Sequence, residues 1–156
     1  MADASALCSA LLLPSMAAFF MSLSALDLFT IGVGPSSSHT VGPMRAARRF
    51  IDGLANRRGL VSRVRCDLYG SLAATGKGHG TDTAVMMGFL GMDPETVDVD
   101  EIPIRVEEIR RAQKLQMPWG DVLPFNPRTD LLFKRLKPLP LHPNGMHFQA
   151  LDVANG

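Results

Sequence analysis

Hydrophobic residues recur every three or four positions over residues 41–58, which is the spacing of one face of an α-helix. This face consists of Met44, Ala47, Phe50, Ile51 and Leu54. Arginines occupy the opposite face, and Gly59 follows at a position that commonly ends a helix. The pattern therefore predicts an amphipathic helix over residues 41–58.

A different pattern, the alternation of apolar and polar residues, predicts strands. Arg63 and Arg65 alternate with apolar residues, so residues 62–69 are expected to form a strand. Isoleucine and valine alternate with charged residues at 102–106, which predicts the start of another strand. Two further strands are expected at residues 130–139 and 146–153, the last of which alternates most clearly.

The remaining elements complete an order of helix, strand, helix and three strands. Residues 81–91 follow a glycine-rich bend and are expected to form the second helix. Asn144 and Gly145 form a dipeptide typical of a hairpin turn before the last strand. This order predicts an α+β fold, a two-layer sandwich with the helices on one face of a small sheet.

Composition places the chain among ordinary globular proteins. It has 156 residues, of which 46% are hydrophobic and 20% charged, with a formal net charge of +1. Without a basic excess, neither nucleic acid nor an anionic membrane is an expected partner. Cys8 and Cys66 are too few for a disulfide framework or for the thiolates of an iron–sulfur cluster, and they fit a reducing cytoplasm.

The first 21 residues differ from the rest of the chain. They are small and apolar, but they lack the basic segment of a secretory signal, and Pro14 and several serines interrupt any membrane-spanning run. We interpret residues 1–21 as an N-terminal extension that is disordered or not native. Residues 22–156 form the predicted domain.

Two polar loops carry the candidate chemistry. The first, "GPSSSHT" at residues 34–40, precedes the helix at 41–58. Hydroxyls and the free N–H groups of a helix start suit a small carboxylate, and His39 is the group there that transfers protons near neutral pH. Simple helix capping is the alternative, since serine and threonine are the commonest N-cap residues. The hydroxyl donors are Ser36, Ser37, Ser38 and Thr40.

The second loop is "GSLAATGKGHGTD" at residues 70–82. Its glycines resemble a phosphate-binding loop, but five residues rather than four separate Gly70 from Gly76, and Gly78 follows Lys77 where serine or threonine is required. The loop is instead expected to present Lys77 and His79, with Thr81 or Asp82 capping the next helix. His142 and His147 are interpreted as structural.

Two histidines on glycine-bounded loops, each before a helix, predict one site built from two helix N-termini. Such a site can perform acid–base chemistry on a small anionic substrate. We therefore expect His39 and His79 to lie close together.

Three segments of this chain are familiar: "LDLFTIGVGPSSSHTVGPMRAARRF", "LYGSLAATGKGHGTDTAVMMGFLG" and "LPLHPNGMHFQALD". They resemble the N-terminal beta domain of bacterial iron–sulfur L-serine dehydratases. The resemblance runs from about Ser24 to the end of the chain and includes both polar loops.

The resemblance implies an L-serine ammonia-lyase that converts L-serine to pyruvate and ammonia without pyridoxal phosphate. A [4Fe-4S] cluster, held by a separate alpha domain or subunit, would act as a Lewis acid on the serine hydroxyl while a protein base removes the α-proton. This chain lacks that domain, so it is expected to be an incomplete, inactive portion of a cytoplasmic homo-oligomer. The implied fold resembles the anion-binding regulatory domain of phosphoglycerate dehydrogenase, with a mixed four-stranded sheet.

The resemblance also implies roles for single residues. His79 is expected to be the proton acceptor and His39 its substrate-orienting partner, although the sequence leaves their order open. The expected substrate-binding residues are Ser36, Ser37, Ser38, Thr40, Lys77, Thr81 and Asp82. The alternative function is a regulatory module that binds a small anion at the helix N-termini and has no catalytic residues.

Overall fold

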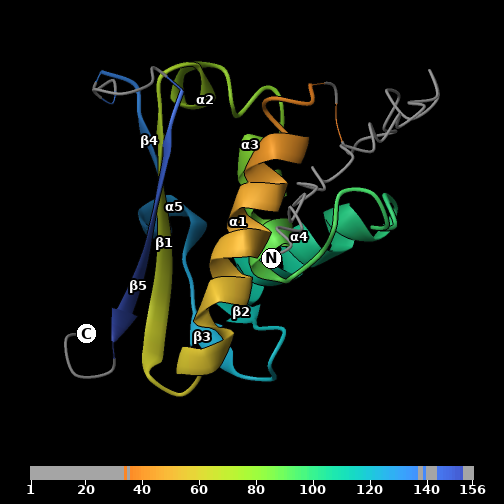
Figure 1. Cartoon of the computed structure of the whole chain (residues 1–156). Helices are drawn as coiled ribbons and strands as arrows, with labels where there is room; N and C mark the ends of the chain where they lie inside the picture. Colours follow the sequence, from red (N-terminus) through yellow and green to blue (C-terminus); the bar gives the residue numbers. More distant parts are fainter. Residues whose placement is uncertain (1–33, 35, 137–138, 140–143, 153–156) are drawn as a thin grey trace, which may run out of the picture. The chain divides into compact units, whose positions relative to one another are not determined.

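The computed structural model describes Gly34, residues 36–136, Leu139 and residues 144–152 (Figure 1). These residues belong to the second of two units of the chain, Ile31–Gly156, and the extension expected at 1–21 lies outside them. The helices are α1 (Val41–Leu54), η2 (Ala55–Arg57, a 3-10 helix), α2 (Ser71–Ala74), α3 (Thr81–Phe89), α4 (Glu101–Ala112) and α5 (Pro127–Asp130). The strands are β1 (Val61–Tyr69), β2 (Lys114–Gln116), β3 (Val122–Pro124), β4 (Leu131–Lys134) and β5 (Met146–Asp152).

A three-stranded mixed sheet with the order β4-β1-β5 forms one layer of the fold. β1 pairs with β4 in parallel and with β5 antiparallel, so that Cys66 lies opposite both Leu131 and Phe148. The hairpin predicted at Asn144 and Gly145 is therefore wrong, because β5 pairs with β1 and not with β4. β2 and β3 form a separate two-stranded sheet.

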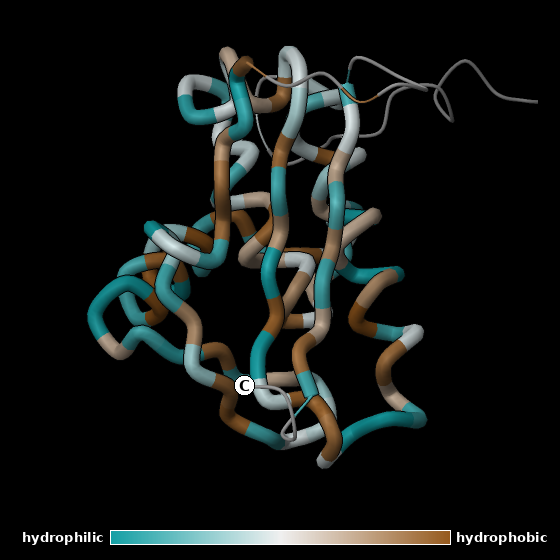
Figure 2. Tube along the Cα trace, turned by 90° about the vertical axis from the view of Figure 1, so that its left-hand side faces the viewer, coloured by the Kyte–Doolittle hydropathy of each residue, from teal (hydrophilic) through white to brown (hydrophobic). Residues whose placement is uncertain are grey.

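Helices α1 and α3 form the second layer on one face of the sheet (Figure 1). Val64, Cys66 and Leu68 of β1 are buried beneath them. Figure 2 views the sheet from the opposite face, where polar and apolar residues alternate along the strands. This arrangement confirms the α+β two-layer sandwich expected from the sequence.

The strand predicted at 102–106 is a helix. In α4 the buried residues are Ile102, Val106 and Ile109, spaced at i, i+4 and i+7, whereas Ile104 is 61% exposed. Five alternating residues imitated a strand, but the burial follows the helical period. Loss of this strand explains why the described sheet has three strands instead of the expected four.

A glycine sets the close packing of the two main helices. A Cβ built on Gly88 of α3 would collide with the Met44 carbonyl and would lie 2.7 Å from the Ala47 Cβ of α1. The absent side chain thus lets the two helix backbones approach each other closely.

Within the described part of the chain, no helix is long and apolar enough to cross a membrane.

Candidate active site

The two histidine-bearing loops meet at one end of the domain because the helices that follow them run side by side in the same direction (Figure 1). Thr81 at the start of α3 contacts His39, the residue before the N-cap of α1. Near the other end of α3, Gly88 packs on Ala47 of α1. Parallel helices place both N-termini, and therefore both loops, at the same edge.

Two threonines link the loops through reciprocal hydrogen bonds. The Thr81 hydroxyl donates to the His39 carbonyl at 2.7 Å, and the Thr40 hydroxyl donates to the His79 carbonyl at 3.3 Å. Both threonines are buried, with exposed fractions of 0% and 3%. Each histidine backbone is thereby held by the threonine of the opposite loop.

The hydrogen bonds of these hydroxyls argue against the alternative that the polar residues of the loops only cap the helices. The N-cap of α1 is Thr40 and that of α3 is Gly80, which adopts the left-handed conformation at φ +73°. Neither N-cap residue makes a side-chain capping hydrogen bond. The expectation that Thr81 or Asp82 caps the second helix is therefore wrong, because Gly80 holds that position.

The imidazoles of His39 and His79 lie against each other, with ring centroids 4.9 Å apart and planes inclined by 37°. Both side chains are half-buried rather than enclosed in the core. The predicted convergence of the two histidines is thus present in the structure.

The hydrogen bond of His79 fixes its tautomer. Nδ1 lies 3.0 Å from the Thr75 carbonyl oxygen, which can only accept, so Nδ1 carries the proton when the ring is neutral. The lone pair then resides on Nε2, to which no hydrogen bond is formed within the described residues. His79 is therefore arranged as a proton acceptor.

His39 is held on both sides by hydroxyls. Its Nε2 lies 3.2 Å from Thr75 Oγ1 and 3.3 Å from Ser71 Oγ. The Thr75 hydroxyl donates to the Ser71 carbonyl at 3.0 Å, so it accepts from His39 Nε2–H. On the other side, Nδ1 lies 3.0 Å from Ser38 Oγ and 3.4 Å from Ser36 Oγ. This ring is oriented and has no free nitrogen.

The structure therefore distinguishes histidines that the sequence left equivalent. One imidazole has an open nitrogen beside solvent, and the other is surrounded by hydroxyl groups. Such an arrangement suits proton abstraction by the first and orientation of a polar substrate by the second.

The other expected site residues divide into two groups. Ser36 and Ser38 contact the His39 ring, and Thr40 and Thr81 hold the backbones of the two histidines. Ser37 is exposed, and its carbonyl accepts from the Gly42 N–H at 2.9 Å. Lys77 and Asp82 make their described contacts elsewhere. The Lys77 ammonium lies 5.5 Å from the Phe133 ring centre, and Asp82 forms an ion pair with Arg110 at 3.7 Å.

A family model described as the serine dehydratase beta chain matches residues 24–156. The chain belongs to this family. It is 49% identical to the L-serine dehydratase of Streptomyces coelicolor over 85% of this chain and 30% of that enzyme. It is also 45% identical to L-serine dehydratase 1 of Escherichia coli over 83% of this chain and 29% of that enzyme. The family inferred from the three sequence motifs is confirmed, and the chain spans less than a third of these relatives.

Two site residues of this serine dehydratase beta chain were missed from the sequence, Ser71 and Thr75. Ser71 begins α2 and Thr75 is its C-cap, and both hydroxyls lie within hydrogen-bond distance of His39 Nε2. The sequence feature that could have identified them is their position between Gly70 and Gly76, two glycines that allow the loop to fold back on itself. Gly70 has φ +60°, and a Cβ on Gly76 would collide with the Leu72 carbonyl.

The described residues do not fit an iron–sulfur cluster. They contain one cysteine, Cys66, which is fully buried in β1, and burial raises the pKa of its thiol far above the ordinary value. Among the described residues, no group of three or more histidine, cysteine, aspartate or glutamate side chains is placed to hold a metal ion. A cluster would need ligands from elsewhere.

Proposed function

We propose that this chain is the beta portion of an L-serine dehydratase, which converts L-serine to pyruvate and ammonia. Membership of the serine dehydratase beta chain family and the names of the relatives support this activity. The rest of the enzyme, including an alpha domain or subunit with a [4Fe-4S] cluster, would come from sequence that these 156 residues do not contain. The proposed enzyme uses no pyridoxal phosphate, and its cytoplasmic location and homo-oligomeric state remain predictions.

The observation that carries the proposal is the paired imidazoles with one open nitrogen. Serine dehydration begins with removal of the proton on Cα and loss of the β-hydroxyl as water, which gives 2-aminoacrylate. Tautomerisation to the imine and hydrolysis then yield pyruvate and ammonia. His79 Nε2 is the acceptor that this chain offers for the α-proton, because its lone pair faces no other group of the described chain.

The serine hydroxyls next to His39 would bind the carboxylate of the substrate. Ser36 and Ser38 lie beside His39 at the N-terminal end of α1, where helix N–H groups also favour an anion. His39, fixed by Thr75 and Ser71, orients the bound substrate relative to His79. Lys77, Thr81 and Asp82 remain proposed contributors, although the Thr81 hydroxyl is already used to hold the His39 backbone.

The test is His79→Gln in the complete enzyme, assembled from this chain and its partner domain. Loss of a general base lowers kcat by about 10²–10⁴-fold, while serine binding and iron content stay unchanged. The measurements are pyruvate formation and exchange of the serine α-proton with deuterated solvent.

His147→Gln is the matched control. His147 is an exposed histidine on β5, in the sheet and not in the histidine loops, so the same chemical change should leave turnover unaltered. A His79→Gln enzyme with kcat within twofold of the unaltered enzyme would refute the assignment.

A further inference from the structure

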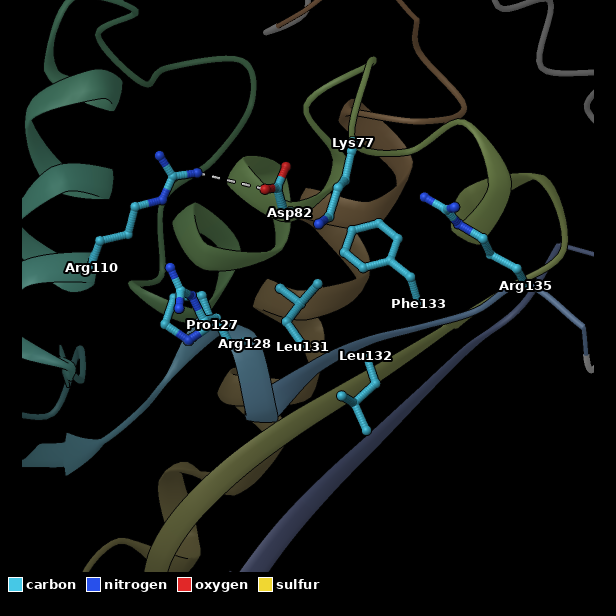
Figure 3. Close-up of a pocket in the computed structure, with 9 residues that line it drawn as sticks. All are labelled: Lys77, Asp82, Arg110, Pro127, Arg128, Leu131, Leu132, Phe133 and Arg135. Atoms are coloured by element: carbon cyan, nitrogen blue, oxygen red, sulfur yellow. Dashed lines mark ion pairs between the residues drawn. The ribbon is translucent and has the colours of Figure 1, made fainter.

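A second site lies next to the paired histidines, and of the residues expected at the substrate site only Lys77 and Asp82 line it. A cavity of about 650 Å³ opens between the glycine-rich loop, α3, α4, α5 and β4 (Figure 3). This volume falls within the range of small-molecule sites, roughly 300–1,000 Å³. Neither imidazole lines the cavity. The residues that do are Lys77, Asp82, Arg110, Pro127, Arg128, Leu131, Leu132, Phe133 and Arg135.

The cavity concentrates positive charge. Four cationic side chains and one carboxylate line it, which leaves three positive charges in excess, whereas the whole chain carries a net charge of +1. The single carboxylate, Asp82, is paired with Arg110. Within the described part of the chain, Lys77, Arg128 and Arg135 have no carboxylate partner. Like charges repel one another, so an anionic ligand would relieve this excess.

The three arginines are arranged at two ends of the cavity. Arg110 and Arg128 lie together, and both also border an adjoining hollow of about 420 Å³. Arg135 lies on the other side of Phe133, with its Nε fixed by a hydrogen bond to the Ala73 carbonyl at 3.2 Å, whereas Lys77 lies over the Phe133 ring on the side of Asp82. Leu131 and Phe133, alternate residues of β4 on the same side of the strand, form an apolar strip between the two ends (Figure 3).

We propose that this cavity binds a small organic dianion with an acidic group at each end, such as an aliphatic dicarboxylate. The apolar strip matches the methylene groups, and each cationic end matches one carboxylate through charge-assisted hydrogen bonds. L-Serine does not fit this description, because its ammonium group would face an excess of positive charge. The inference therefore goes beyond the proposed dehydratase reaction and concerns a different ligand.

The test is isothermal titration calorimetry of the 156-residue chain with succinate and with propionate, which has the same apolar part but one carboxylate. Succinate should bind at least about tenfold more tightly than propionate, because the second charged contact is worth 1.4 kcal/mol or more. The affinity should fall as ionic strength rises from about 0.01 to 0.15 M, since the charges are partly exposed to solvent.

Two variants test the two ends separately. Arg128→Ala and Arg135→Ala should each weaken succinate binding about tenfold and bring it close to the affinity of propionate. Arg49→Ala, which removes an exposed cation of α1 outside the cavity, should leave the affinity unchanged. Circular dichroism confirms that each variant is folded.

Three results would overturn the proposal: equal affinities for succinate and propionate, no binding of either, or equal losses in Arg49→Ala and Arg128→Ala. Each of these is independent of the dehydratase assignment, which is decided by the turnover of His79→Gln. The two proposals can therefore fail separately.

Discussion

Two polar networks of this domain can be compared directly: the histidine loops and a network around Asp130. Asp130 ends α5 and is fully buried, and its carboxylate is surrounded on all sides. Arg63 Nη2 donates to Oδ2 at 3.0 Å, Arg65 Nε donates to Oδ1 at 3.2 Å, and the Asn126 N–H donates to Oδ2 at 2.7 Å. Arg63 Nε also lies 2.9 Å from Oδ1.

The difference is that the Asp130 network is closed and the histidine loops are open. Every oxygen of Asp130 is occupied by a group of the protein, which ties α5 to β1. In the histidine loops the backbone is also constrained, by Thr40 and Thr81, yet His79 Nε2 forms no hydrogen bond with any residue that the structure describes. All the oxygens of Asp130 are satisfied, which stabilises the fold, although the buried Nε of Arg63 forms no hydrogen bond within the described part of the chain. A rigid network that leaves one reactive atom open is suited to chemistry.

The largest expected effect on stability comes from breaking the closed network with Asp130→Asn. Loss of the buried charge leaves Arg63 and Arg65 without their partner and should lower the free energy of unfolding by about 2–4 kcal/mol. This is somewhat less than for a fully buried pair, because the two arginine side chains are 33% and 38% exposed. Urea unfolding followed by circular dichroism measures it.

Asp52→Asn is the control for that change. Asp52 is 61% exposed and pairs with Arg48 at 3.7 Å on the surface of α1, so its loss should cost no more than about 0.5 kcal/mol. Equal effects of the two substitutions would show that burial of Asp130 is not what gives its network its strength.

A smaller effect is expected when one of the links between the histidine loops is removed. Thr81→Val keeps the shape of the side chain but leaves the His39 carbonyl without its donor, which should lower the free energy of unfolding by about 1–3 kcal/mol. In the complete enzyme the same change should reduce kcat, since the His39 backbone is no longer fixed relative to His79. Urea unfolding and pyruvate formation measure the two effects.

Thr83→Val offers a matched comparison on the same helix. Thr83 is half-buried in α3 and forms no hydrogen bond through its hydroxyl among the described interactions. If Thr81→Val proved as stable and as active as Thr83→Val, the reciprocal threonine bonds would have no role in holding the loops.

Sequence patterns identified the elements whose burial is regular over many residues. The predictions for 41–58, 62–69 and 81–91 correspond to α1, β1 and α3. The first two present one apolar face to the core, whereas α3 is buried on nearly all sides and was marked by the glycine-rich bend before it. The segment at 102–106 failed because five alternating residues fit a strand as well as a helix. Ile109, one helical turn beyond Val106, was the residue that favoured the helix.

Part of the site could also be predicted from the sequence, because the meeting of the two histidines follows from the packing of two regular helices. Two histidines on loops before two helices were expected to meet, and they do because α1 and α3 pack in parallel at Gly88. The roles of Ser71 and Thr75 depend on how the glycine-rich loop folds back beneath His39, which is a tertiary contact without a local pattern. The same contacts decided which histidine nitrogen is open, a question the sequence left unanswered.

The smallest effect is expected at Tyr69, whose hydroxyl is intermediate between the two networks because it has a partner, Asp67, but is only partly buried. Tyr69 lies at the end of β1, and its hydroxyl donates to Asp67 Oδ2 at 3.4 Å. Partial burial and the Asp67 carboxylate raise the pKa of Tyr69 above its ordinary value of 10.0. Because the folded state holds this proton more tightly than the unfolded state, the stability that it contributes is present below about pH 10 and is lost as the pH rises through the folded-state pKa.

Tyr69 is the only tyrosine of the chain, so absorbance at the phenolate band reports its titration alone. The midpoint should lie above that of free tyrosine and should move down in Asp67→Asn, where the carboxylate charge is removed. The Asp130→Asn variant, whose carboxylate pairs with Arg63 and Arg65 and not with Tyr69, should leave the midpoint where it was. A midpoint unchanged in Asp67→Asn would mean that this carboxylate does not act on Tyr69, so that a single, partly exposed contact lacks the effect expected of the buried contacts around Asp130.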